Sequence, residues 1–404
     1  MVETNNNCAR PLLKHITLHG FLSCGPDAIT IPLSALNVFI GPNGSGKSNL
    51  VEAFSVLRAA PKDLPLPIRR GGGVKDWLWK GPPAAEKAAI EIVFSEGAVG
   101  NGKGTKPAMR YRLVFGAEGG SFIVLDESVA NDVPPPDSAE PVVYFGYENG
   151  RPVLYSVSGE KRQLNREDLD PTQSILSQRK DPESYPELTK IAWLLGQIRC
   201  YRSWPFGPDS VLRQSCGADV PTDALSESFD NLPARLAVLM KNPTVKRNLI
   251  DHLQSLSPGF DDLSVVPEGG PLQLYLTDGE RTIPARRLSD GTLRYLCLLA
   301  ILLDLTPPPF IVIEEPELGL HPDMMPILRD LMVEASGRCQ ILTTTHSTTF
   351  VDAFTQYADS VLTCEMNDGA SVISRLSQKE VDRLGVEGGL GSLWMSGHIG
   401  GTRW

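Results

Sequence analysis

Eight residues, Gly41 to Ser48, constrain the fold of this chain more than any other feature. They read Gly-Pro-Asn-Gly-Ser-Gly-Lys-Ser and fit the pattern G-x-x-x-x-G-K-[ST] in full. A loop of this kind needs a strand before it and a helix after it. Asn37 to Ile40 is an apolar run typical of a strand, and Asn49 to Ala60 has apolar residues at helical spacing. The sequence therefore predicts a strand–loop–helix unit, and both flanks argue against a chance glycine-rich turn.

The residue types in this loop indicate phosphate binding. Glycines permit positive φ and close backbone approach, so that successive N–H groups point at phosphate oxygens, and the helix N-terminus adds partial positive charge. Lys47 would reach the β- and γ-phosphates, and the Ser48 hydroxyl would bind Mg²⁺. We therefore expect ATP and Mg²⁺ as cofactors. The expected cradle is Asn43, Gly44, Ser45, Gly46, Lys47, Ser48 and Asn49.

Two acids follow a second apolar run, Phe310 to Ile313. Because ligands bind at the carboxyl ends of strands in open α/β sheets, Glu314 is expected to hold Mg²⁺ and Glu315 to act as general base toward water. His346 follows the next apolar and threonine-rich run, and we expect it to contact the γ-phosphate or orient the water. Solvated acids and a structural histidine are the alternatives, and the phosphate-binding loop argues against them.

The rest of the chain divides into regions of different pattern. Short strands separated by Gly-rich turns between residues 89 and 147 predict an antiparallel meander, Pro61 to Pro67 predicts a break, and residues 164–256 read mainly as helices and loops. Helices and strands then alternate from Thr292 to Thr363, which is typical of a parallel sheet covered by helices.

With these residues in place, the chain resembles an ABC-type ATPase head. Leu288 to Thr292, Leu-Ser-Asp-Gly-Thr, resembles the family signature LSGGQ and departs from it at Asp290 and Thr292. In that family the signature caps the γ-phosphate bound by the opposite protomer, which implies this role for Ser289 and Gly291 and implies a dimer. The loop, the signature, the paired acids and the histidine occur in the family's order along the chain.

One run of residues, which begins at the second of the paired acids, narrows the resemblance to a subgroup of these ATPases. Glu315 to Pro322, Glu-Pro-Glu-Leu-Gly-Leu-His-Pro, resembles the RecF, SMC and OLD-type ATPases, and Ile68 to Gly73 is similar to predicted ATPases near RecF. Similar proteins serve in DNA repair and in bacterial or phage-defence modules. The resemblance also implies a Mg²⁺-sensing glutamine, for which Gln178 is the candidate, with a surface glutamine as the alternative. Between Lys47 and Ser289 there is no room for a long coiled coil, and the part after His346 is too short for an OLD-type nuclease domain.

Composition limits the partners and the compartment. The net charge of −10 excludes a chain that is basic all over, although Arg69, Arg70, Lys75 and Lys80 form a basic group that fits either a solvated face or a nucleic-acid contact. Seven cysteines without a CxxC fit a reducing cytoplasm, and the polar first ten residues lack the apolar run of a signal peptide. The longest apolar stretch, Leu293 to Leu305, is too short to span a bilayer, so no membrane contact is expected.

We therefore expect an α/β P-loop ATPase head of the ABC type with an antiparallel subdomain and a helical insertion. The expected division is an N-terminal lobe (residues 1–160), a mainly helical insertion (161–270) and a C-terminal lobe (271–404). ATP would join two copies into a dimer or a larger oligomer, and hydrolysis would release them, so that the head acts as a switch on an effector protein or on DNA. The alternatives are an ATP-sensing scaffold with little turnover and a transport ATPase subunit.

Overall fold

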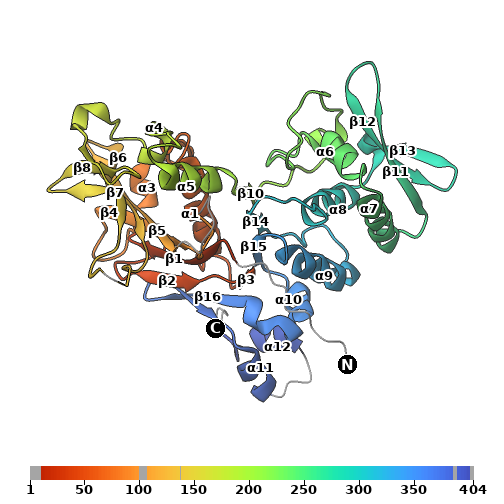
Figure 1. The fold of residues 1–404 in the computed structure, drawn as a ribbon. Coiled ribbons are helices and arrows are strands. Elements are labelled where there is room, and N and C mark those ends of the chain that lie inside the picture. The colour runs from red at the N-terminus through yellow and green to blue at the C-terminus, as the bar shows by residue number, and fades with distance from the viewer. Residues whose placement is uncertain (1–10, 100–106, 137, 385–388, 401–404) are drawn as a thin grey trace.

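The computed structural model describes residues 11–99, 107–136, 138–384 and 389–400, and Figure 1 shows their arrangement. Three sheets organise the chain. The central one has six strands in the order β10-β14-β15-β3-β16-β17. Its first five strands run parallel, and β17 runs antiparallel to β16. These strands are β3 (Leu36–Ile40), β10 (Arg199–Tyr201), β14 (Phe310–Glu314), β15 (Gln340–Thr345), β16 (Val361–Asn367) and β17 (Ala370–Arg375).

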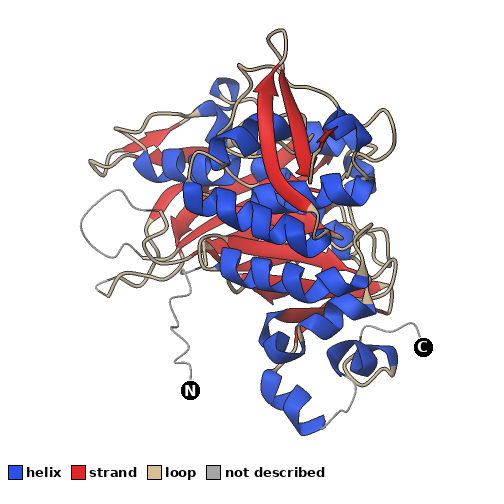
Figure 2. Ribbon diagram, turned by 90° about the vertical axis from the view of Figure 1, so that its right-hand side faces the viewer, coloured by secondary structure: helices blue, strands red, loops and turns tan. Residues whose placement is uncertain are grey.

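The central sheet is covered on both faces, which explains why its strands are continuous apolar runs. Alternate residues of a strand point to opposite faces. In β14, Phe310 and Val312 join the core that contains α1 (Lys47–Ala59), and Phe310 stacks on Phe54 of that helix with ring centroids 4.6 Å apart. Ile311 and Ile313 join the second core, with α8 (Asp290–Leu302) and α9 (Met325–Ser336). In Figure 2, several helices lie roughly parallel in front of the strands.

An eight-stranded antiparallel sheet packs on the other side of α1, in the red-to-yellow half of Figure 1. Its order is β2-β1-β4-β5-β6-β7-β8-β9, so β4 to β9 are neighbours in chain order and the predicted meander is confirmed. The strands are β1 (Leu13–His19), β2 (Ile29–Pro32), β4 (Lys87–Phe94), β5 (Met109–Glu118), β6 (Ser121–Asn131), β7 (Val143–Glu148), β8 (Arg151–Tyr155) and β9 (Lys161–Gln163).

The segment expected to be mainly helical, residues 161–270, contains helices and also strands. Strand β10 pairs in parallel with β14 in the central sheet, and β11 (Phe260–Pro267) forms the third sheet with β12 (Leu272–Asp278) and β13 (Arg281–Pro284). Its helices are α4 (Ile175–Gln178), α5 (Pro186–Gly196), α6 (Leu232–Leu239) and α7 (Pro243–Leu256). The division of the chain at residues 160/161 and 270/271 stays a prediction.

The proline-rich segment Pro61 to Pro67 was expected to break the chain, and in the structure it leads into a short helix. Helix α2 (Pro65–Arg70) begins with Pro65, because the fixed φ of proline suits the first turn and its missing N–H would have had no partner there. The remaining helices are α3 (Val74–Trp77), α10 (Thr348–Ala353), α11 (Gln378–Leu384) and α12 (Gly389–Met395).

The Gly-rich stretch Gly385 to Gly401 is described only in part, because residues 385–388 and 401 lie outside the described residues. Within it, α12 docks on α10 through the Gly391 N–H, which donates to Asp352 at 2.6 Å. The polar first ten residues also lie outside the described part. Among the helices described, none has the length and apolar character needed to cross a membrane.

Candidate functional site

The loop from Gly41 to Ser48 joins the end of β3 to the start of α1, as predicted. Gly46 caps the helix with φ of 98°, and Gly44 has φ of 83°, values that L-residues rarely adopt. A Cβ on Gly46 would lie 2.1 Å from the Ser371 hydroxyl, and one on Gly41 would lie 2.2 Å from the Cys364 carbonyl oxygen. The loop is therefore packed so tightly that only glycine fits at Gly41 and Gly46.

Lys47 extends across this loop. Its ammonium donates to the carbonyl oxygens of Gly41 at 2.6 Å and Pro42 at 2.9 Å. Burial lowers the pKa of Lys47 to about 8, and the nearby Glu315 acts in the opposite direction. A buried cation held only by neutral oxygens is suited to bind a polyanion. The next residue, Ser48, is exposed at the start of α1, so its hydroxyl is accessible to a cation.

Glu314 ends β14 at the same sheet edge and is already paired. Its Oε2 accepts from Arg202 Nε at 2.8 Å, and its backbone carbonyl accepts from Trp204 Nε1 at 2.9 Å. Arg202 also pairs with Glu52 of α1 at 2.8 Å. Because β10 is parallel to β14, Arg202 follows the carboxyl end of the neighbouring strand. The structure therefore shows a cation beside the carboxylate that was expected to hold Mg²⁺.

Glu315 and His346 lie together between the ends of β14 and β15. Their Oε1 and Nε2 atoms are 3.4 Å apart, and each side chain is 36% exposed. Glu315 has φ of 47°, an unusual value for a glutamate. Burial and the Lys47 cation lower the pKa of His346, which keeps the imidazole neutral at pH 7. The structure thus brings Lys47, Glu315 and His346 to one edge of the sheet.

The backbone of Glu315 is held from both sides. Its N–H donates to the Thr344 carbonyl at 2.9 Å, and its carbonyl accepts from Arg294 of α8. Arg294 is fully buried, lies 4.0 Å over the Trp204 ring, and has its pKa lowered to about 10 by burial. The half-buried Glu317 accepts a hydrogen bond from the buried Thr345 hydroxyl, and desolvation raises the pKa of Glu317.

The signature-like segment lies elsewhere on the chain. Ser289 caps α8, and its hydroxyl accepts from Thr292 N–H at 3.1 Å. Asp290 pairs with Arg213 and accepts from Gly207 N–H, and a Cβ on Gly291 would lie 2.7 Å from the Gly319 carbonyl oxygen. Among the described residues, no hydrogen bond or ion pair joins this segment to the phosphate-binding loop.

The structure corrects the prediction for Gln178, because it does not bring this residue to the sheet edge where Lys47, Glu315 and His346 lie. Its amide oxygen accepts from Asp170 N–H at 2.8 Å, and its amide nitrogen donates to the Asp170 and Gln173 carbonyls. Gln173 in turn contacts Asp63 and Leu64, just beyond the C-terminal end of α1. Since α1 has 13 residues, that end lies about 20 Å from the phosphate-binding loop. Gln178 is therefore part of a distant loop, and its resemblance-based metal role does not fit the structure.

Two residues at the edge were missed by the sequence analysis, Arg202 and Arg294. Each is positioned by tertiary contacts, Arg202 by the pairing of β10 with β14 and Arg294 by the packing of α8 under Trp204. The sequence carries only a weak signal for Arg202, which directly follows a short strand-like run that ends in Tyr201. Arg294 stands out as the one arginine within the apolar run from Leu293 to Leu303.

The fold is that of an ABC-type P-loop ATPase head. A parallel central sheet, an antiparallel sheet beside it and the loop at the end of β3 are the features that carry this assignment. The chain belongs to the family described as "AAA domain, putative AbiEii toxin, Type IV TA system", whose model matches residues 36–195 and 209–352.

Relatives of known structure have the same fold. An Smc head bound to the C-terminal winged-helix domain of ScpA aligns with a TM-score of 0.57 and 19% identity, over 92% of this chain and 99% of that one. An Smc head with an extended coiled coil from Pyrococcus furiosus, bound to the C-terminal domain of ScpA, has a TM-score of 0.58 and 17% identity, over 93% and 98%.

A sequence relative matches over a shorter region. The chromosome partition protein Smc of Coxiella burnetii (strain RSA 493 / Nine Mile phase I) is 38% identical over 96 residues, which are 22% of this chain. The match spans 8% of that relative's length.

Proposed function

We propose that this chain hydrolyses ATP with Mg²⁺ and that its active site is completed by a second copy of the chain. The observation that carries the proposal is the meeting of Lys47, Glu315 and His346 at one sheet edge, with Glu315 Oε1 and His346 Nε2 3.4 Å apart. A cation for phosphates, a carboxylate for water and a neutral imidazole beside it are the groups that phosphoryl transfer to water needs.

Each residue has a separate role in this proposal. Lys47 binds the β- and γ-phosphates, and the narrow glycine turn at Gly46 lets backbone N–H groups approach them. The Ser48 hydroxyl and the Glu314 carboxylate hold Mg²⁺, which neutralises charge on the phosphates. Glu315 takes the proton of the attacking water. His346, held neutral by burial and by Lys47, orients that water through its ring nitrogens.

The position of Ser289 supports an active site that is completed by a second copy of the chain. A hydroxyl and free N–H groups at the start of α8, a helix of 13 residues, form an anion site. Among the described residues no hydrogen bond or ion pair joins this segment to the phosphate-binding loop of its own chain, so it is available to cap the γ-phosphate held by a second copy. ATP then joins the two copies, and hydrolysis releases them. Dimers of this kind can also assemble into larger oligomers.

The biological setting is part of the proposal. The family description names a toxin of a Type IV TA system, and the Smc heads of similar fold are bound to ScpA. We infer a switch that acts on an effector protein or on DNA in a defence or repair module, in the cytoplasm. The six cysteines among the described residues are free thiols, as a reducing compartment favours.

A second candidate function rests on one contact. Arg202 pairs with the Glu314 carboxylate at 2.8 Å, and a cation in this position competes with Mg²⁺ for the carboxylate oxygens. This contact favours an ATP-sensing scaffold that turns ATP over slowly and assembles with an effector. Comparison of turnover with ATP-dependent assembly separates the two functions, because a scaffold assembles on ATP at concentrations where almost no phosphate is released.

The test is the Glu315→Gln variant, with phosphate release and mass in solution measured with and without ATP. We expect turnover to be lost and an ATP-dependent dimer to accumulate. The matched control is Glu280→Gln, the same change at an exposed turn between β12 and β13. Turnover of Glu315→Gln equal to that of the wild type would show that Glu315 is not the base.

A further inference from the structure

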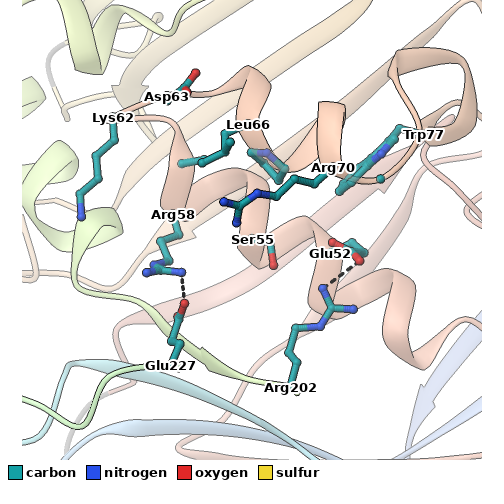
Figure 3. A pocket seen from close by; sticks show the side chains of 13 residues that line it. Glu52, Ser55, Arg58, Lys62, Asp63, Leu66, Arg70, Trp77, Arg202 and Glu227 are labelled. Carbon is teal, nitrogen blue, oxygen red and sulfur yellow. Dashed lines mark hydrogen bonds and ion pairs between the residues drawn. The ribbon is translucent and has the colours of Figure 1, made fainter. Parts of the chain in front are cut away.

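A cavity of about 470 Å³ lies beside α1, on the side away from the glycine turn. Its walls come from α1, from α2 with the turn after it, and from Arg202 and Glu227 across the cleft (Figure 3). A second cavity of about 630 Å³ adjoins it, because Arg58, Lys62, Arg70 and Glu227 line both. This size is typical of a site for a small molecule.

The two cavities gather five cations: Arg58, Lys62, Arg70, Arg199 and Arg202. The walls also carry five acids, Glu52, Asp63, Asp223, Glu227 and Asp230, and three of the cations pair with acids among them. Arg58 pairs with Glu227, Arg202 pairs with Glu52 at 2.8 Å, and Arg199 lies 3.7 Å from the mostly exposed Asp223.

Lys62 and Arg70 have no acid partner among the described residues. Figure 3 shows Arg70 reaching over Ser55, Arg58 turned toward Glu227, and Lys62 farther to the side. Partial burial and the cations of Arg58 and Arg199 lower the pKa of Lys62. Glu227 acts in the opposite direction on that pKa, but the side-chain nitrogens of Lys62 and Arg70 are not held by an acid of the described residues and can donate to an anion.

One part of the wall is apolar. Leu66 and Pro67 of α2 and the Trp77 ring line the cavity opposite the polar face of α1. Leu66 is 39% exposed, so it leaves an apolar edge at the opening. A site with cations on one side and apolar groups on the other fits a small molecule that carries a phosphate and a ring. A half-open cleft of this volume is too small for a duplex, whose phosphates need an exposed basic surface.

We propose that this cavity binds a small phosphorylated ligand of nucleotide size, with its phosphate between Lys62, Arg70 and Arg58 and its ring against Leu66 and Trp77. This site is separate from the phosphate-binding loop. It lies along α1 from Glu52 to Ala59 and the turn that follows, whereas the loop lies at the N-terminal end of that helix. The binding site does not depend on the proposed ATPase activity.

One residue connects the cavity to the sheet edge. Arg202 lines the cavity and pairs with both Glu52 and Glu314. Glu52 follows Ser48 by four residues, so the two lie on one face of α1. An anion in the cavity attracts Arg202 and weakens its hold on Glu314, which frees that carboxylate for Mg²⁺. This coupling, unlike the binding itself, rests on the proposed function.

The binding test uses the full chain with AMP and with inorganic pyrophosphate, followed by calorimetry. AMP lacks the β-phosphate that the glycine loop would bind. The variants are Lys62→Ala and Arg70→Ala, and the matched control is Arg69→Ala, an exposed neighbour that does not line the cavity. Because a hydrogen bond to a charged group is lost, we expect each cavity variant to bind AMP at least about tenfold more weakly, and Arg69→Ala to bind as the wild type does.

Three results would overturn the binding proposal. One is AMP binding that survives Lys62→Ala and Arg70→Ala but is lost in Lys47→Ala, which would assign it to the glycine loop. The second is binding of pyrophosphate and not AMP, which would remove the role of the apolar wall. The third is cavity-dependent binding of a single-stranded oligonucleotide without any binding of AMP, which would make the ligand a nucleic acid.

The coupling is tested by the Mg²⁺ dependence of ATP turnover with and without AMP. We expect AMP to lower the Mg²⁺ concentration for half-maximal turnover in the wild type and in Arg69→Ala, and to leave that concentration unchanged in Lys62→Ala. If AMP binds at the cavity and the Mg²⁺ dependence does not move, the coupling is wrong and the site stands. If no variant turns over ATP, the proposed function fails and the calorimetry still decides the site.

Discussion

Arg202 Nε lies 2.8 Å from Glu314 Oε2, so the carboxylate that ends β14 is paired with a cation from the neighbouring parallel strand. Arg202 is 28% exposed and Glu314 is 15% exposed, which places the pair out of most solvent screening. Under the proposed function, Mg²⁺ would have to compete with Arg202 for the oxygens of Glu314. The pair would then set how easily this acid accepts the metal.

The first prediction concerns this pair. Arg202→Gln keeps a side chain of similar length and removes the charge that competes with Mg²⁺. We expect the Mg²⁺ concentration for half-maximal ATP turnover to fall by about fivefold, since one charge at this range contributes on the order of 1 kcal/mol. The measurement is a Mg²⁺ titration of phosphate release. Arg199→Gln, which removes a cation of the same strand that does not contact Glu314, is the control.

An unchanged or raised Mg²⁺ requirement in Arg202→Gln would contradict the competition. A raised requirement in particular would mean that Arg202 holds Glu314 in the position the metal needs. The Arg202→Lys variant distinguishes competition from positioning, because it keeps the positive charge and loses the simultaneous contact with Glu52 and Glu314. Competition predicts that Lys behaves as Arg does, whereas a positioning role predicts that Lys behaves as Gln does.

Local sequence patterns predicted the parts of the site that short segments build. Glycines at fixed spacing define the turn before α1, and an apolar strand that stops at an acid places Glu314 at a sheet edge. His346 could be placed because one helix and one strand separate it from Glu315, which brings it to the adjacent strand end. The position of each residue follows from the local pattern of the strand that it ends or follows.

Long-range contacts account for what the sequence did not predict. Strand β10 has three residues, too few for a periodic signal, and it exists because it pairs with β14 more than 100 residues away, which is also what positions Arg202. The Gln178 prediction failed for a different reason, which is local. A glutamine carries no directional signal, and its amide is satisfied by Asp170 and Gln173 within its own loop.

The second prediction concerns Arg294, the buried arginine below Glu315. Arg294→Met removes the donor to the Glu315 carbonyl and keeps much of the volume over Trp204. Two nitrogens of this guanidinium, Nε and Nη1, are buried without a hydrogen-bond partner, so removing the charge costs little stability. We expect ATP turnover to fall at least about tenfold because the unusual backbone of Glu315 loses its support, with the thermal midpoint unchanged or raised.

Turnover and thermal unfolding of Arg294→Met are measured on the same preparation. A large drop of the thermal midpoint together with the loss of turnover would mean that Arg294 holds the fold and has no separate effect on the site. Leu298→Met serves as the control, a volume-preserving change at another buried position of α8. Its turnover should stay near that of the wild type.

The third prediction is a pH dependence of stability from Glu127 on β6. This carboxyl is 2% exposed and accepts from Tyr111, Ser174 and the Ile175 N–H. Burial raises its pKa from 4.5 to about 7. Its contribution is therefore fully present below pH 4.5 and is lost as pH rises through about 7, by about 3 kcal/mol in the free energy of unfolding.

Denaturant unfolding at several pH values between 5 and 8 tests this, with Glu127→Gln as the reference. The amide cannot ionise and keeps both a donor and an acceptor for the same partners. We expect the wild type to lose stability relative to Glu127→Gln as pH rises. A constant difference between the two proteins over this range would show that Glu127 does not titrate there.

The fourth prediction tests whether two copies share one site. Lys47→Ala removes the phosphate cation, and Ser289→Arg blocks the start of α8, so each variant alone should show no turnover. A mixed dimer has one loop with Lys47 facing one intact Ser289, and one site in which both are altered. In an equal mixture with random pairing, half of the dimers are mixed and one of their two sites works, so about a quarter of wild-type turnover should return.

The recovery depends on exchange of subunits, so the variants are mixed without ATP and incubated before ATP is added. The control mixture is Lys47→Ala with Glu315→Gln. Both changes fall on the same half of the site, so every mixed site lacks either Lys47 or Glu315 and no turnover returns. Recovery in the control as well would point to contamination, and no recovery in either mixture, despite mixed dimers detected by mass, would place Ser289 outside the site of the second copy.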